Sequence, residues 1–176
     1  MNATFFIRLK AFMYDYILLF LYLVLLFIVN VFLFPGLQNF FSGSLITAQL
    51  TGFIMVTLPI SIYFIISDSN IIGQSFGKKK ARIQVVGENG ESPSVFRITC
   101  RTILKFLPWE LSHFLVYRLV SIGDGDVPVT YYLIGGLVYL LMFIYIGTAI
   151  FTKKKQSLYD LLTKTYVIRE NTRPNQ

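Results

Sequence analysis

The sequence predicts an all-α integral membrane protein, a bundle of four membrane helices of which the third is short and polar. Of its 176 residues, 55% are hydrophobic and only 14% are charged, whereas soluble domains usually carry about 25% charge. Residues 16–67 and residues 127–152 contain no Asp, Glu, Lys or Arg. Such long uncharged runs suit a bilayer and not water. The same composition excludes a disordered chain, which would be poor in apolar residues and rich in charge.

The first predicted span covers residues 12–34 and the second covers residues 45–66. The uncharged run that holds them is far too long for one crossing of about 20 residues. Pro35-Gly36 and Ser42-Gly43-Ser44 break it into a hairpin. The first apolar stretch also exceeds the core of a signal peptide, about 7–15 residues, and no cleavage motif follows it. We therefore expect a retained membrane helix.

A cytoplasmic loop with a possible β-hairpin is expected at residues 67–92. The segment 83–86 is rich in β-branched residues, and Asn89-Gly90 is a tight-turn dipeptide. The segment from Gly73 to Lys78 looks superficially like a phosphate-binding loop. That loop needs four residues between its glycines and a Ser or Thr after its lysine, and this segment has neither. A tight turn is expected here, not a nucleotide site.

An interfacial amphipathic helix is predicted at residues 93–107. Its apolar side chains are interleaved with Arg97, Arg101 and Lys105, which are spaced by four residues and so share one face. A basic stripe of this kind predicts a helix that lies at the membrane surface and binds anionic lipid headgroups. Pro108 is expected to interrupt this helix.

The third span, residues 107–122, is ambiguous because it contains polar side chains. Glu110 and His113 are three residues apart, a spacing that fits a shared metal ion, a proton relay, or plain hydrogen bonds inside the bundle. A metal site would need further ligands, and the chain has no second histidine. The single cysteine, Cys100, excludes an intramolecular disulfide and a cysteine metal cluster. We expect no metal and no cofactor. The last span covers residues 129–152.

The distribution of cations predicts the orientation of the spans. Lys and Arg number two before the first span, none in its loop, seven in residues 67–107, none in residues 121–128, and six from residue 153 onward. Short cytoplasmic loops are enriched in cations, so the alternation predicts four crossings with both termini cytoplasmic. The position of the cations beside apolar spans argues against nucleic acid as a partner.

Three charged residues form the candidate functional cluster. Arg8 and Asp15 are seven residues apart, nearly two helical turns, so they share a face at the start of the first span. A carboxylate at this depth is a functional candidate by default, although a structural ion pair at the cytoplasmic interface is the simpler explanation. Asp160 follows the last span by a few residues and should return to the same depth. We predict that Arg8, Asp15 and Asp160 meet at the cytoplasmic mouth of the bundle.

These residues resemble the RDD family of bacterial membrane proteins, which is named for an arginine and two aspartates. The similarity covers residues 8–168, nearly the whole chain. Two positions depart from the family pattern: Tyr159 stands where His is frequent, and Ser75 stands where Thr is common. The matching segments are Arg8 to Asp15, Gly73 to Lys78, Ile83 to Val86, Arg101, and Gln156 to Ile168.

The resemblance implies a protein of the bacterial inner membrane, with transport as the usual expectation and cation–proton exchange suggested for some members. Two functions stay open. One is a small ion or proton-coupled transporter, or a transporter subunit, with Asp15 near the path. The other is a non-transporting scaffold or accessory protein in a complex. An enzyme is not expected, because no catalytic triad, zinc-protease motif or paired aspartates appear. Four short spans seldom enclose a pathway alone, so transport implies a homo-oligomer or a membrane partner.

Overall fold

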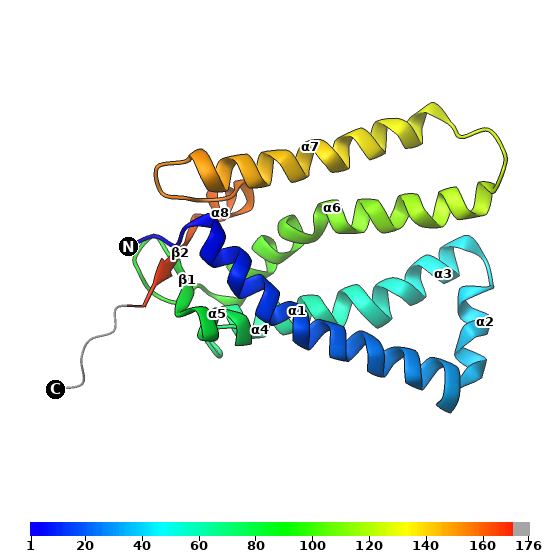
Figure 1. Ribbon diagram of the computed structural model, residues 1–176, viewed down its shortest axis with the longest axis horizontal. Coiled ribbons are helices and arrows are strands. Elements are labelled where there is room, and N and C mark those ends of the chain that lie inside the picture. Colours follow the sequence, from blue (N-terminus) through cyan, green and yellow to red (C-terminus); the bar gives the residue numbers. More distant parts are fainter. Residues whose placement is uncertain (171–176) are drawn as a thin grey trace.

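The computed structural model describes residues 1–170 and has the all-α membrane architecture that the composition predicts. Four long helical segments lie alongside one another (Figure 1). Four short elements gather at one end of the bundle, together with the N-terminus: α5 (Phe76–Ala81), β1 (Ile83–Gly87), α8 (Leu158–Leu162) and β2 (Thr165–Arg169). We call this the sheet end. The opposite end carries α2 (Gln38–Phe41) and the connection between α6 (Val95–Ile122) and α7 (Val129–Phe151), and we call it the loop end.

The first hairpin runs from the sheet end to the loop end and back, and it breaks where proline, glycine and serine predict a break. The Ser44 hydroxyl accepts a hydrogen bond from the backbone N–H of Thr47 and so caps the returning helix. Each arm contains one π-helical turn. In chain order, the elements are α1 (Phe5–Ile28), η1 (Val29–Leu33), η2 (Pro35–Leu37), α2 (Gln38–Phe41), α3 (Leu45–Gly52), η3 (Phe53–Thr57) and α4 (Leu58–Asp68).

The second hairpin consists of α6 (Val95–Ile122) and α7 (Val129–Phe151). α6 is one continuous helix of 28 residues, which corrects the division into an interfacial helix and a separate span at Pro108. A proline removes the hydrogen bond to the carbonyl four residues earlier. Here that carbonyl, of Leu104, accepts a hydrogen bond of 2.6 Å from the Tyr145 hydroxyl on α7. A neighbouring helix thus supplies the missing donor, and α6 continues through the proline.

By length and apolarity, three helical segments of residues 1–170 could cross a membrane: Phe5–Leu33, Leu45–Asp68 and Val129–Phe151. They correspond to the first, second and last predicted spans. α6 lies beside them over a similar length (Figure 1), and its residues would rise about 42 Å, more than a hydrocarbon core of about 30 Å. Its charged residues distinguish it from the other three. The crossing by α6 stays a prediction.

A two-stranded antiparallel sheet ties the middle of the chain to its C-terminal part. β1 (Ile83–Gly87) pairs with β2 (Thr165–Arg169), and Val85 lies opposite Val167. This replaces the hairpin within residues 67–92, because the turn after β1 leads into α6 and not into a second strand. Two short helices flank the sheet, α5 (Phe76–Ala81) and α8 (Leu158–Leu162).

The buried core is concentrated at the sheet end. Ile83, Val85, Ile98 and Val167 pack together there, each almost fully buried. Toward the loop end the long helices instead turn large apolar side chains outward, as Phe20 and Leu21 of α1 do. Exposed apolar surface on this scale would be unfavourable in water, and a bilayer covers it.

Candidate functional site

Asp160 is the centre of the charge cluster at the sheet end. It lies in the first turn of α8 and is fully buried. Arg8 of α1 donates from Nη1 to Asp160 Oδ2 at 2.6 Å. Arg101 of α6 donates from Nε to Oδ1 at 2.8 Å, and its Nη2 lies 2.8 Å from the same oxygen. One carboxylate therefore joins two long helices through charge-assisted hydrogen bonds, which are stronger than neutral ones.

The ionisation of Asp160 follows from these two guanidinium groups. Burial by itself would raise the pKa of the Asp160 carboxyl, but the charges of Arg101 and Arg8 outweigh burial and hold the pKa below its usual range. The neighbouring Tyr159 responds in the opposite direction: burial and the charge of Asp160 raise the pKa of its hydroxyl. Asp160 is therefore a permanent anion in the folded protein at neutral pH.

Asp15 does not join this cluster, which corrects the prediction of a single group. Its Oδ1 accepts hydrogen bonds from the Tyr63 hydroxyl at 2.8 Å and the Gly77 backbone N–H at 2.7 Å, and its Oδ2 accepts one from Ser75 at 2.7 Å. The reason is the close approach of α5 to α1. A Cβ on Gly77 would lie 2.8 Å from the Asp15 backbone nitrogen and would collide with the Ala11 carbonyl oxygen.

Arg101 corrects the prediction of a lipid-binding basic stripe. Only 3% of Arg101 is exposed, and Nη1 lies 3.7 Å from Asp68 in addition to the Asp160 contacts. Lys105 also turns inward and lines a cavity. Of the three predicted stripe residues, only Arg97 is exposed. The spacing of four places the cations on one face, as expected, but that face packs against α4 and α8.

Sequence reasoning missed a second buried ion pair, between Asp68 at the end of α4 and Lys78 in α5. Lys78 Nζ lies 2.8 Å from Asp68 Oδ2, and both residues are buried. Both residues fall within residues 67–92, where the sequence predicts a cytoplasmic loop and a tight turn. The signal in the sequence is a single acidic residue close to a run of cations. If such a carboxylate becomes buried, it needs a cationic partner.

Glu110 and His113 do meet on α6. His113 Nδ1 lies 3.5 Å from Glu110 Oε1, and each side chain is about one third exposed. Glu110 also accepts a hydrogen bond from the hydroxyl of Thr57, the last residue of η3. Nearer the loop end, Arg118 donates to Gln49 at 3.3 Å. α6 therefore directs polar groups toward the second arm of the first hairpin.

The model of the RDD family matches residues 2–164 of this sequence. The chain belongs to the RDD family. Comparison with curated proteins and with solved structures finds no match. The matched range contains Arg8, Asp15 and Asp160. In this RDD-family chain the arginine contacts the second aspartate, while the first aspartate fixes α5 against α1.

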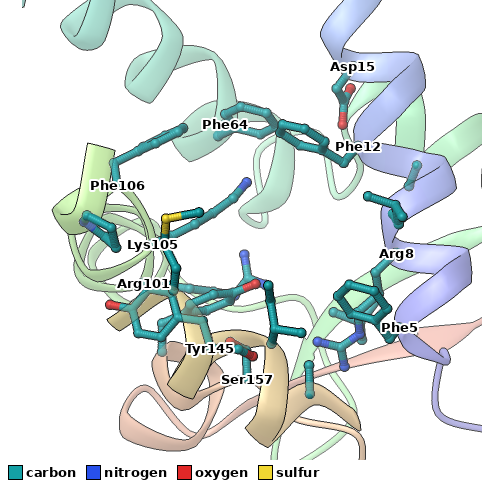
Figure 2. Close-up of a pocket in the computed structure, with 18 of the residues that line it drawn as sticks. Phe5, Arg8, Phe12, Asp15, Phe64, Arg101, Lys105, Phe106, Tyr145 and Ser157 are labelled. Carbon is teal, nitrogen blue, oxygen red and sulfur yellow. Dashed lines mark hydrogen bonds between the residues drawn. The ribbon is translucent and has the colours of Figure 1, made fainter. Parts of the chain in front are cut away.

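The RDD-family chain also has a partly open cavity of about 550 Å³ beside the charge cluster. Figure 2 shows side chains from several elements around its open centre, among them Phe12 and Arg8 of α1, Phe64 of α4 and Lys105 of α6. The walls are mostly aromatic or aliphatic, and four cationic side chains also line the space. The volume is in the range of small-molecule sites.

Residues 1–170 contain no cluster of side chains suited to bind a metal ion. No group of three or more His, Cys, Asp or Glu side chains in that part of the RDD-family chain could hold a metal ion. Glu110 and His113 supply only two such ligands, and Thr57 already occupies a Glu110 oxygen. The arrangement suits proton exchange better than metal coordination.

Proposed function

We propose that this RDD-family protein is a proton-coupled ion transporter, or the membrane subunit of one, in which Glu110 and His113 of α6 carry the proton. The proposal is supported chiefly by one observation: a carboxylate and an imidazole contact each other on a helix that lies beside three apolar helices. Ionisable side chains inside a membrane are costly and usually mark ion or proton pathways. An imidazole changes charge near neutral pH, and so it can exchange a proton with an adjacent carboxylate.

The contact between α6 and η3 adds support. η3 provides the Thr57 hydroxyl to Glu110, and its Met55 carbonyl accepts a hydrogen bond from Tyr22 of α1. π-helical turns are frequent at functional sites, because they free backbone groups from the regular helical pattern. In the proposed transporter, this turn connects α1 with the proton-carrying pair on α6.

Asp15 is not proposed as the ion ligand. Its two oxygens already accept three hydrogen bonds from protein groups, and its side chain is almost fully buried. A cation at Asp15 would have to displace the attachment of α5. The path is therefore assigned to α6, and Asp15 keeps a structural role.

The proposal includes the arrangement in the membrane and the partners. α6 crosses the membrane as the third of four spans, the sheet end with both termini faces the cytoplasm, and the membrane is the bacterial inner membrane. Exposed cations at that end, Arg97 and Lys153 among them, contact anionic headgroups. A second copy packs on α7, where Gly136 and Gly147 have no neighbour within 4 Å and lie three turns apart on one face. The protein is not an enzyme.

Proton flux through the purified protein tests this proposal. The protein is reconstituted into liposomes that contain a pH-sensitive dye, and sodium or potassium gradients are imposed in separate experiments. The wild type should move protons in response to one of these gradients. Glu110→Gln should lower the rate at least tenfold, and His113→Gln should lower it as well. The matched control Glu88→Gln, on an exposed loop residue, should leave it unchanged.

Two results would reject proton-coupled transport. One is a wild-type flux equal to that of empty liposomes under every gradient, which would favour a scaffold or accessory role. The other is an unchanged flux in Glu110→Gln, which would place the pathway elsewhere.

A further inference from the structure

The cavity at the sheet end has two chemically different parts. Phe5 and Phe12 of α1, Phe64 of α4 and Phe106 of α6 give it aromatic walls, and α7 adds aliphatic side chains. Cations from three helices line the same space: Arg8, Lys78, Arg101 and Lys105. An apolar chamber with a few convergent polar groups is the usual form of a ligand site.

The charges around the cavity do not balance. Four cations line it, and the carboxylates that contact them or lie beside them are three: Asp15, Asp68 and Asp160. The excess charge is assigned to Lys105. Within residues 1–170 its ammonium group has no hydrogen-bond acceptor or carboxylate partner. It lies 3.9 Å from the centre of the Phe64 ring instead. A cation–π contact of this kind attracts the ammonium group but gives it no hydrogen-bond acceptor.

Arg8 provides a second unused donor. Its Nη1 binds Asp160, while its buried Nη2 has no hydrogen-bond partner within residues 1–170. Figure 2 shows Arg8 and Lys105 on facing sides of the open space. A buried guanidinium nitrogen without an acceptor is unfavourable, and an anionic group in the cavity would provide one.

We propose that this cavity binds a single-chain anionic amphiphile, a molecule with one acidic head group and one long apolar chain. The head, a carboxylate or a phosphate, accepts from Lys105 and Arg8, and the chain lies along the aromatic walls. A neutral lipid would leave the cations unpaired, and a free inorganic anion would leave the walls empty. The inference goes beyond proton transfer and does not depend on Glu110, because the site lies at the sheet end with its own residues.

Trp109 gives a direct way to measure binding. It is the only tryptophan of the chain and it lines the cavity. The purified protein in nanodiscs of neutral lipid is titrated with a long-chain fatty acid that carries bromine on its chain, because bromine quenches tryptophan fluorescence on contact. The expected result is quenching that saturates at one fatty acid per chain. The unbrominated fatty acid and the matching alkyl phosphate should reverse it, whereas its methyl ester and inorganic phosphate should not.

Substitutions at Lys105 test the assigned residue. Lys105→Gln should weaken binding at least tenfold, and Lys105→Arg should largely retain it, since the charge is kept. Lys153→Gln, on an exposed cation just after α7, is the control for general attraction to charged lipid and should bind like the wild type. Far-ultraviolet circular dichroism of each variant verifies that the helices are intact.

Several results would overturn the proposal. Quenching that rises linearly and equally in wild type and Lys105→Gln would indicate partition into the lipid only. Equal competition by the methyl ester would remove the acidic head from the recognition, and competition by inorganic phosphate would identify a site for free anions. If Lys105→Gln does not fold, loss of binding in Lys105→Arg with intact helices would equally contradict the role of the charge.

Discussion

Asp160→Asn removes the one negative charge that lies between Arg8 and Arg101. Breaking a buried ion pair by removing one partner costs about 3–5 kcal/mol. Asp68, at 3.7 Å from Arg101, still offers that guanidinium partial compensation, so we expect the lower part of this range. For a chain of this length, each kcal/mol corresponds to about 2–4 °C in the unfolding midpoint, so a loss of about 3 kcal/mol lowers it by about 6–12 °C.

Thermal unfolding in detergent, followed by circular dichroism at one detergent concentration, measures this change. Asp124→Asn is the matched control, because Asp124 is exposed on the loop between α6 and α7, and its midpoint should equal that of the wild type. Arg8→Gln should cost less than Asp160→Asn, since Arg101 remains on the carboxylate. Equal midpoints for wild type and Asp160→Asn would refute the central position of Asp160.

The pH dependence of the same difference follows from the lowered pKa of Asp160. A carboxyl whose pKa is lower in the folded state contributes stability above its unfolded value, about 3.9, and loses it as the pH falls through the lower folded value. The gap between wild type and Asp160→Asn should therefore be constant near neutral pH and should close only in acid below about pH 4. A gap that closed between pH 6 and 8 would contradict this assignment.

Two further predictions use the same unfolding assay. Gly77→Ala should destabilise by about 1–3 kcal/mol or more, because its Cβ would collide with α1. Gly36→Ala, where an added Cβ would meet no atom within 4 Å, should be neutral or slightly stabilising, and equal behaviour of the two alanine variants would count against the close approach of α5. Tyr145→Phe should cost about 1–2 kcal/mol, since it leaves the Leu104 carbonyl without a donor. The exposed Tyr139 provides the control Tyr139→Phe, and a Tyr145→Phe protein as stable as this control would refute the compensation at Pro108.

The sequence predicts the apolar helices well, because length and absence of charge are sufficient to identify them. It fails at α6, where the residue that compensates Pro108 lies on another helix. No local pattern reports that Tyr145 will reach Leu104. The pairing of β1 with β2 is missed for the same reason, since a strand in a loop does not reveal a partner far along the chain.

The candidate site is predicted in part. Asp160 follows the last span by a few residues, and from this position it is correctly predicted to lie at the same end of the bundle as Arg8. The helical period shows that Arg101 and Lys105 share a face, but it cannot show whether lipid or protein covers that face. The prediction that Asp15 belongs to the cluster is wrong because α5 inserts beside this residue. The insertion depends on Gly77, and the role of Gly77 is apparent only when the backbones of α1 and α5 are seen in contact.

The proposed proton pathway requires Glu110 and His113 to lie inside the bilayer, so the most direct test is whether α6 crosses the membrane. In a Cys100→Ser background, single cysteines replace Asp124 at the loop end and Glu88 at the sheet end, both exposed. Spheroplasts of the expression host are treated with a membrane-impermeant maleimide, before and after permeabilisation. If α6 crosses the membrane, Asp124→Cys reacts in intact spheroplasts and Glu88→Cys reacts only after permeabilisation. Reaction of both cysteines from the same side would contradict the crossing.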